Sequence, residues 1–260
     1  MSRTICVYNQ KGGVGKTTTV INLAAALGIL RKKVLVVDMD PQGNTTSGLG
    51  IDKRALSVEL YDALNKEEEI AQVVCATTSK RVRLLPSTSA LTGFEIEAVG
   101  REHRERILKD TLEPIRERYD YVLIDCPPSL GLLSLNALCA SGSVLIPIQT
   151  EYYALEGVSQ LVETIDMVRS AFHPQLAIEG VLLTLFDGRN NLATDVMNEV
   201  KKYFADEVFD TIIPRSIRLA EAPSYGESVL SYDRKSKGAQ AYLALAREVI
   251  RKKRNDRSKR

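Results

Sequence analysis

The chain has 260 residues, of which 44% are apolar, with 35 Lys and Arg against 33 Asp and Glu. This length and apolar content allow one large packed domain and exclude a chain that is disordered throughout. The small net charge of +2 is unevenly distributed, because the last ten residues, RKKRNDRSKR, carry +6. The remaining 250 residues therefore carry −4. We expect a mildly acidic domain over 1–250 and a basic tail over 251–260.

The sequence has no feature of a membrane or secreted protein. No apolar run approaches the roughly 18–20 residues that a membrane span needs, and the start, MSRTICVYNQKGG, lacks the apolar region of a signal peptide. We therefore expect a cytosolic chain. The four cysteines form no CxxC pair, which predicts free thiols rather than disulfides or metal ligands. They are Cys6, Cys75, Cys126 and Cys139.

Short runs rich in β-branched residues alternate with helical patterns along the whole chain. Most of these runs are apolar throughout, which is typical of strands that are covered on both faces of a parallel sheet. The alternation predicts an α/β fold with a single doubly wound, mostly parallel sheet and helices on both faces. Strands are expected over 4–8, 34–38, 121–125, 143–148, 180–185 and 208–213, and helices near 16–30, 101–117, 131–141, 155–171, 191–204 and 237–253.

Polar clusters follow these strand runs. Doubly wound sheets bind their ligands at the carboxyl ends of the strands, so clusters at these positions are expected to meet on one rim. Such convergence favours an active site over a merely structural α/β core. The clusters span 9–18, 38–46, 125–129, 149–153, 187–191 and 214–218.

The first cluster, NQKGGVGKTT over 9–18, lies between a predicted strand and a predicted helix. Its glycines allow successive N–H groups to face an anion, and the helix adds the positive end of its dipole. Lys16 supplies a charge for the β- and γ-phosphates, and the Thr17 hydroxyl suits Mg²⁺. The predicted ATP contacts are Lys11, Gly12, Gly13, Val14, Gly15, Lys16, Thr17 and Thr18.

Aspartates at the ends of two other predicted strands indicate metal-assisted hydrolysis. Asp38 closes one apolar run and is followed by Met39 and Asp40, and Asp125 closes another. Hydrolysis of a phosphoanhydride needs Mg²⁺ near the phosphate oxygens and an oriented water molecule. Aspartates on separate strands beside a phosphate loop can supply both.

The phosphate loop departs from the ordinary G-x-x-x-x-G-K-[ST] form, because Gln10 occupies the first glycine position and Lys11 is an additional lysine. This pattern resembles the deviant Walker A ATPases, whose signature is KGGxGK[ST]. Five further blocks resemble the ParA/Soj chromosome-partitioning family over nearly the full chain. They are DMDPQGNTTSGLG (38–50), DCPPSLGLLSLNAL (125–138), PIQTEYYALEG (147–157), GVLLTLFDGR (180–189) and IPRSIRLAEAPSYG (213–226).

The resemblance implies specific roles for the residues of the predicted site. Lys11 would reach the ATP of the opposite subunit in a nucleotide-sandwich dimer, although a solvated loop lysine is the alternative. Asp125 would act on Mg²⁺ through water, and Asp40 would position the attacking water. Asp38 would lie in the second shell of Mg²⁺ or of the phosphate-loop lysine, and Pro214 would line the adenine. Lys11, Lys16 and Asp40 are thus the expected catalytic residues, and Thr17, Asp38 and Asp125 the expected Mg²⁺ site.

The resemblance also implies partners. An ATP-dependent homodimer would bind double-stranded DNA non-specifically on the nucleoid, and a ParB-like protein would release it by stimulating hydrolysis. The chain starts three residues before its first predicted strand, which leaves no room for an N-terminal helix-turn-helix. We therefore expect contacts with backbone phosphates and little base readout.

Arg189 and Arg218 match the family's surface arginines, and 234–237 adds a basic cluster. Ordinary solvated surface charge is the alternative for each of these side chains. The tail could add an electrostatic contact with DNA, or it could be a frayed, solubilising terminus. The predicted DNA contacts are Arg189, Arg218, Arg234, Lys235 and Lys237.

Other functions use the same phosphate loop. A MinD-like membrane ATPase needs a C-terminal amphipathic helix, but here ten polar residues follow Ile250. An iron–sulfur reductase needs cluster cysteines, and the spacing of Cys75 and Cys126 does not match them. A non-enzymatic nucleotide-binding scaffold and a ParA-like protein that positions a non-DNA cargo are the remaining alternatives.

Overall fold

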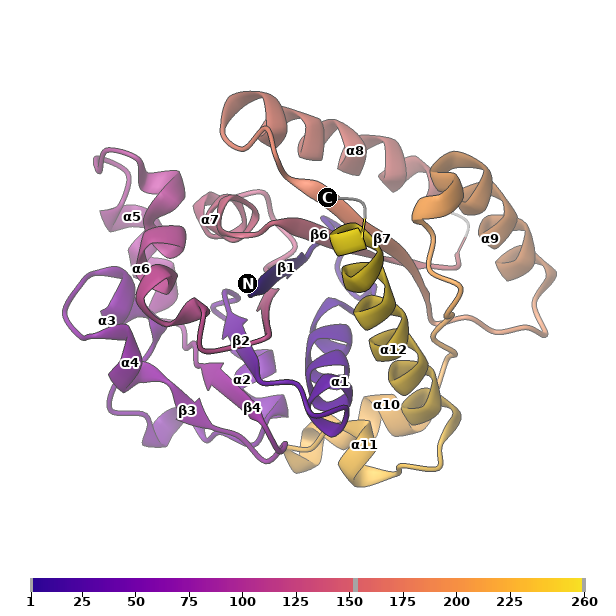
Figure 1. Cartoon of the computed structure of the whole chain (residues 1–260), viewed down its shortest axis with the longest axis horizontal. Coiled ribbons are helices and arrows are strands. Elements are labelled where there is room, and N and C mark those ends of the chain that lie inside the picture. The colour runs from indigo at the N-terminus through magenta and orange to yellow at the C-terminus, as the bar shows by residue number, and fades with distance from the viewer. Residues whose placement is uncertain (1, 152–153, 259–260) are drawn as a thin grey trace.

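A computed structural model describes residues 2–151 and 154–258 (Figure 1). The described residues contain a seven-stranded sheet with the order β3-β4-β2-β5-β1-β6-β7. Every neighbouring pair is parallel except β3 and β4, which are antiparallel. The predicted mostly parallel sheet is thus confirmed. The strands are β1 (Arg3–Val7), β2 (Val34–Asp38), β3 (Cys75–Ala76), β4 (Val82–Leu85), β5 (Tyr121–Asp125), β6 (Ser143–Gln149) and β7 (Ala177–Thr184).

Helices cover both faces of this sheet. Figure 1 shows α1, α10, α11 and α12 on one side and α5 to α7 on the other. The α-helices are α1 (Lys16–Ile29), α2 (Asn44–Gly48), α3 (Leu60–Leu64), α4 (Ile70–Val73), α5 (Leu91–Glu97), α6 (Ile107–Arg116), α7 (Leu132–Ala140), α8 (Ala154–Ala171), α9 (Asn191–Phe204), α10 (Ile217–Glu221), α11 (Val229–Tyr232) and α12 (Lys237–Ser258). Short 3₁₀ turns are η1 (Lys53–Ala55), η2 (Arg104–Arg106), η3 (Ala205–Glu207) and η4 (Ala222–Tyr225). Among the described residues, no helix combines the length and apolar character that a membrane crossing requires.

Two hydrophobic cores lie on opposite faces of the sheet, because successive strand residues point to opposite sides. Ile5 and Val7 pack in the core that α1 and α12 cover. Cys6 and Tyr8, from the same strand and the residue after it, pack in the core beneath α3 to α9. This two-sided burial explains why the strand runs are apolar throughout.

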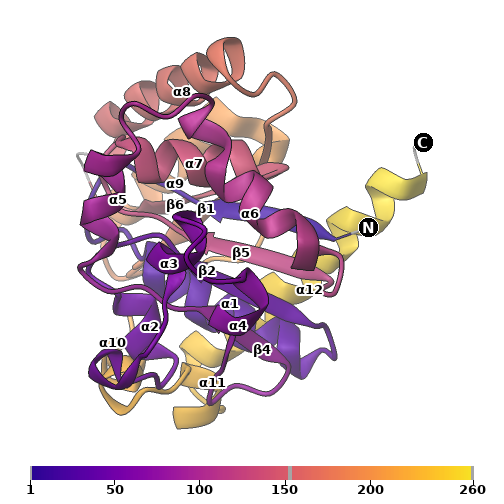
Figure 2. The same ribbon diagram turned by 90° about the vertical axis from the view of Figure 1, so that its left-hand side faces the viewer.

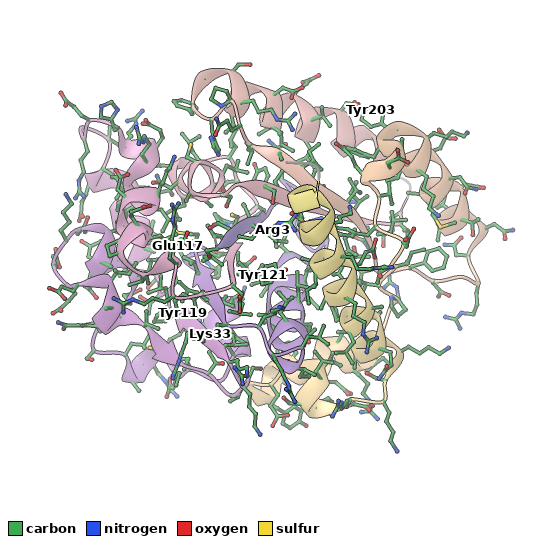
Figure 3. All side chains as sticks on the ribbon, in the orientation of Figure 1. Arg3, Lys33, Glu117, Tyr119, Tyr121 and Tyr203 are labelled. Atoms are coloured by element: carbon green, nitrogen blue, oxygen red, sulfur yellow. The ribbon has the colours of Figure 1, made fainter. Side chains whose placement is uncertain are left out.

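The sheet register brings the predicted site to one edge. Asp38 at the end of β2 is the partner of Asp125 at the end of β5, and Val7 at the end of β1 also pairs with Asp125. The opposite edge is structural. There Arg3 and Tyr121 lie at the starts of β1 and β5 with Lys33 close by (Figure 3), and Lys33 accepts a backbone hydrogen bond from Asp120 at 2.8 Å.

The strand predicted over 208–213 is wrong. Val208 forms only an isolated bridge with Val181 of β7. The backbone N–H groups of Phe209 and Ile213 do reach the Val181 and Leu183 carbonyls of β7, both at 2.9 Å. Between them, the N–H groups of Asp210 and Thr211 donate to the Glu248 carboxylate of α12 at 2.8 and 3.2 Å. A helix side chain therefore interrupts the pairing of this segment with β7.

Other elements also differ from the prediction. The helix expected over 101–117 begins only at Ile107, because His103 adopts a left-handed backbone with φ of 52° and a 3₁₀ turn follows it. The short elements between 44 and 97, including β3 and β4, were not predicted. At the C-terminus, α12 continues through Ser258, so most of the segment 251–260 is helical. Cys6, Cys126 and Cys139 are buried free thiols, and Cys75 is a half-buried one.

Candidate functional site

The loop between β1 and α1 has the shape of an anion cradle. Gly13 and Gly15 adopt left-handed backbones with φ of 75° and 89°, a conformation that other residues enter at a cost. A Cβ added to Gly12 or Gly13 would meet nothing within 4 Å, so the loop faces open space. The α-helix begins directly after Gly15, which points the positive end of its dipole at this space.

Contacts with the sheet hold the loop in this shape. The Asn9 side chain accepts a hydrogen bond from the Lys11 backbone at 2.9 Å and donates to the Pro147 carbonyl at 2.8 Å. On the other side, the Thr184 hydroxyl at the end of β7 donates to the Val14 carbonyl at 2.8 Å. The cradle is therefore preorganised by β1, β6 and β7 together.

Lys16 is the buried cation of the cradle and is only 7% exposed. Its Nζ donates to the carbonyls of Asn9 and Lys11 at 2.9 and 3.0 Å. Burial lowers its pKa, and the nearby carboxylates of Asp125 and Asp40 oppose that shift. Its direct partners are thus neutral, and an anion in the cradle would be a stronger one.

Asp125 lies fully buried beside the cradle. One of its oxygens, Oδ2, accepts hydrogen bonds from the hydroxyls of Thr17 at 2.7 Å and Thr45 at 2.6 Å. Burial raises the pKa of Asp125, whereas the two hydroxyls and Lys16 lower it. The structure thus brings Thr17 and Asp125, two residues of the predicted Mg²⁺ site, into direct contact.

Asp38 is the second buried carboxylate. Its Oδ2 accepts hydrogen bonds from the backbone N–H and the hydroxyl of Thr46, at 2.8 and 2.7 Å. Burial raises its pKa, and the neighbouring Asp125 raises it further. Two buried carboxylates in register favour either a bound proton or a nearby cation.

These residues fit Mg²⁺. Hard cations prefer oxygen ligands, and Mg²⁺ is usually held by one or two carboxylates together with waters and substrate phosphates. Thr17, Asp38 and Asp125 supply that donor set next to the phosphate cradle. The described residues contain no group of three or more His, Cys, Asp and Glu side chains placed to hold a metal by themselves. The cation would therefore depend on phosphate oxygens as well.

Asp40 lies at the margin of this centre and is half-buried. Its Oδ1 accepts a hydrogen bond from the Gln42 backbone at 2.9 Å, and its backbone carbonyl accepts one from the Ser87 hydroxyl at 2.9 Å. Its charge acts on both Lys16 and Asp125. The carboxylate is thus close to the reacting region without being bonded to either of those side chains.

Thr45 and Thr46 were missed by sequence reasoning although both contact the predicted carboxylates. They follow a left-handed Gly43 at the start of α2, and both are fully buried. The run NTT within 38–50 belongs to a block of the family resemblance. Hydroxyl residues seven and eight positions after a strand-end aspartate are the sequence signal that could have identified them.

Pro214 lies at the same rim. It forms a parallel bridge with Phe186, and Arg215 donates its backbone N–H to the Phe186 carbonyl at 2.9 Å. Phe186 follows Thr184, whose hydroxyl holds the phosphate loop. The structure therefore brings Pro214 to the side of the cradle where β7 ends.

Comparison with known proteins decides the family. A family model described as an AAA domain matches residues 2–178. The chain is 53% identical to the sporulation initiation inhibitor protein Soj of Bacillus subtilis, over 96% of this chain and 98% of that protein. It is 52% identical to the chromosome partitioning protein ParA of Myxococcus xanthus, over 97% and 89%. The chain belongs to the ParA/Soj family of P-loop ATPases.

A solved structure agrees with this ParA/Soj assignment in fold. The cobyrinic acid a,c-diamide synthase of Mycobacterium smegmatis, crystallised with ADP and magnesium, superposes with a TM-score of 0.86. It is 39% identical and covers 96% of this chain and 95% of that one. The doubly wound P-loop fold is therefore shared over nearly the full length.

The basic residues that the ParA/Soj resemblance assigns to DNA are exposed, but two of them are ion-paired. Arg189 makes two hydrogen bonds to Asp187, at 2.9 and 2.7 Å, which lower the pKa of that carboxyl to about 2. Arg218 contacts Glu221 at 2.9 Å and Asp233 at 3.5 Å. The exposed side chains of Arg234 and Lys235 lie in the turn between α11 and α12, and the exposed Lys237 is the first residue of α12.

Proposed function

We propose that this chain is a DNA-partitioning ATPase that acts as an ATP-bound dimer. The observation that carries the proposal is the cluster at the carboxyl edge of the sheet. It unites the buried ammonium group of Lys16, the Thr17–Asp125 pair and the Asp40 carboxylate on one rim. A merely structural α/β core has no reason to bury a lysine and two aspartates beside an open glycine loop.

ATP would bind with its phosphates in the glycine loop. Lys16 would exchange its carbonyl partners for phosphate oxygens, which are charged and therefore bind the ammonium group more strongly. Thr17 and Asp125 would hold Mg²⁺, and Asp38 would support them from the neighbouring strand. Bound Mg²⁺ would neutralise charge that develops on the β- and γ-oxygens.

Hydrolysis requires a water molecule aligned with the γ-phosphorus. The new bond joins the water oxygen to phosphorus, and the bond to the β–γ bridging oxygen breaks, which yields ADP and phosphate. Asp40 would orient this water, since its carboxylate lies near Lys16 and Asp125 without bonding to them. Ser87 holds the Asp40 backbone in place for this role.

Dimerisation would complete the site. The loop is open at Gly12 and Gly13, and the half-buried Lys11 stands at its edge. In the proposed sandwich, Lys11 of each subunit reaches the phosphates of the other. The alternative is that Lys11 is an ordinary solvated loop lysine. In that case replacing Lys11 would have no effect on dimerisation.

DNA binding would use Arg189, Arg218 and the turn over 234–237. Each arginine must trade an acidic partner for a phosphate, so a single subunit is expected to bind DNA weakly. Two subunits joined by ATP present twice the contacts, and such multivalency raises affinity without new residues. Lys252, in the basic segment over 251–260, already has partners within the subunit. Its Nζ donates to the Glu179 carbonyl and lies 4.1 Å from the Phe209 ring centroid.

Membership of the ParA/Soj family extends the proposal to the cellular setting. The protein would be cytoplasmic and associated with the nucleoid, and a ParB-like protein would stimulate hydrolysis and release the dimer. A chromosome or plasmid is the proposed cargo. A membrane-bound positioning ATPase and a ParA-like carrier of a non-DNA cargo are the alternatives.

An ATPase assay tests the proposal. Phosphate release should need Mg²⁺ and should rise when duplex DNA and the ParB-like protein are added together. Liposomes of anionic lipid serve as the comparison for a membrane-bound ATPase. Stimulation by liposomes but not by DNA would contradict the proposal.

A further inference from the structure

The segment that presents Arg218 is a distinct surface block, which we define as residues 217–233 and call the arginine block. It comprises α10, η4, α11 and Asp233. Within it, Arg218 is held by Glu221 and Asp233, and its guanidinium carbon lies 6.0 Å from the centroid of the Tyr232 ring. The placement of Arg218 therefore depends on the placement of α11.

One anchor ties the arginine block to the phosphate-binding helix. Asn22 on α1 is buried, with 1% of its surface exposed. Its Nδ2 donates to the Thr18 carbonyl in the first turn of α1 at 2.8 Å. Its Oδ1 accepts the backbone N–H of Val229, the first residue of α11, also at 2.8 Å. One carboxamide thus joins the first turn of α1, which directly follows the glycine loop, to the start of α11.

A second anchor lies where η4 meets the end of α2. Gly50 and Gly226 both have left-handed backbones, and a Cβ on Gly226 would come within 2.8 Å of the Gly50 Cα. The Thr78 hydroxyl lies 3.0 Å from the Gly226 carbonyl and 3.3 Å from the Leu49 carbonyl. The two turns are therefore in backbone contact, and one hydroxyl bridges them.

Both anchors end on elements that hold the nucleotide site. The first residue of α1 is Lys16, and α2 carries Thr45 and Thr46, which hold Asp125 and Asp38. The 3₁₀ turn η4 packs against α2, and α11 packs against α1, which lies above it in Figure 2. A change in α1 or α2 when nucleotide binds can thus reach the arginine block by two routes. One is the buried Asn22 side chain, and the other is the contact between Gly50 and Gly226 that Thr78 bridges.

We propose that Asn22 and Thr78 are positioning residues that couple nucleotide binding to the DNA contact made by Arg218. This inference rests on the proposed function, because it takes Arg218 as a DNA contact. Coupling between two sites is reciprocal: if ATP raises DNA affinity by a factor, DNA raises ATP affinity by the same factor. In this proposal Asn22 and Thr78 contact neither ATP nor DNA. Substituting either residue should therefore lower the factor by which each ligand raises the affinity for the other.

The chain offers a matched control for Asn22. Asn136 on α7 is also buried, its Nδ2 donates to the carbonyl four residues earlier, Leu132, at 2.9 Å, and its Oδ1 accepts the Leu108 backbone N–H at 3.0 Å. Asn136→Ala therefore removes the same kind of hydrogen bonds far from the arginine block. Thr78 is exposed, so Thr78→Val provides a mild second variant that should fold.

The experiment measures duplex DNA affinity by fluorescence anisotropy with and without a non-hydrolysable ATP analogue and Mg²⁺. In Asn22→Ala the gain in DNA affinity on adding the analogue should fall by about fivefold or more, the low end of measured couplings. The DNA-induced gain in analogue affinity should fall by the same factor. Affinity for the analogue without DNA should stay within about twofold, and Thr78→Val should shift the gain in the same direction.

Asn136→Ala should keep the wild-type gain. If Asn22→Ala and Thr78→Val also keep it, the inference is overturned. If Asn22→Ala fails to fold, Thr78→Val alone decides. Arg218→Ala tests whether Arg218 contacts DNA at all. Unchanged DNA affinity in this variant would contradict the proposed DNA surface, and with it this inference.

Discussion

Replacing Thr45 with valine should shift the pH range in which Mg²⁺ supports nucleotide binding. Valine has nearly the same shape as threonine, so the change removes the hydroxyl and leaves the packing of α2 largely intact. In the structure this hydroxyl donates to Asp125 Oδ2 at 2.6 Å, and both side chains are fully buried. Thr17 would remain as the other hydroxyl donor to that oxygen.

The size of the shift follows from the lost hydrogen bond. A hydrogen bond to a charged group contributes about 1.5–3 kcal/mol, and about 1.36 kcal/mol corresponds to one pKa unit. Asp125 already has a raised pKa because it is buried, and the Thr45 hydroxyl opposes that rise. Removing the hydroxyl raises the pKa further, so Asp125 takes up its proton, and Mg²⁺ is lost, at a pH higher by roughly 1–2 units.

Isothermal titration calorimetry between pH 5 and 8 measures this directly, as the gain in ATP affinity on adding Mg²⁺ at each pH. Thr111→Val is the matched control, because the Thr111 hydroxyl donates to the Ile107 carbonyl on α6, away from the site. The control should keep the wild-type pH midpoint. A folded Thr45→Val protein with the wild-type midpoint would refute the reasoning that Asp125 acts on the cation.

Three further predictions concern the remaining site residues. Lys16→Ala should weaken ATP binding by at least about 100-fold in calorimetry, because the phosphates lose a buried, charge-assisted partner; binding within threefold of the wild type would contradict this. Asp40→Ala should keep ATP affinity within about threefold and lower phosphate release by about 100-fold or more, and normal turnover would remove Asp40 from the mechanism. The double substitution Arg189→Ala and Arg218→Ala should reduce the slope of log affinity for DNA against log salt by about 3.6, because the ATP-bound dimer loses four phosphate contacts at about 0.9 each, with ATP binding retained; an unchanged slope would mean that neither arginine touches DNA.

The sequence predicted the central part of the sheet because its strands are covered on both faces. Unbroken apolar runs such as 34–38 and 121–125 follow directly from that burial. The edge elements were less predictable: β3 has only two residues, and β4 interrupts its apolar run with the exposed Arg83. The wrong strand over 208–213 had suitable residues, but Glu248 from the last helix takes two of its backbone donors and interrupts its pairing with β7.

The same division applies to the site. Lys16, Thr17 and Asp125 follow from local patterns at strand ends, and the structure brings them together. Thr45 and Asn22 act through contacts with residues distant in sequence: Asp125 is 80 positions from Thr45, and Val229 is 207 positions from Asn22. No local periodicity marks such residues. The ion pairs of the two surface arginines were equally invisible, although they determine how strongly each can bind a phosphate.

The central claim is that ATP converts this protein into a DNA-binding form. The most direct measurement is the affinity of the wild-type chain for a duplex of arbitrary sequence, compared between Mg²⁺ with a non-hydrolysable ATP analogue and Mg²⁺ with ADP, over a range of salt concentrations. The account predicts tight, sequence-independent and steeply salt-dependent binding in the first condition and weak binding in the second. Equal affinity in both conditions would contradict it.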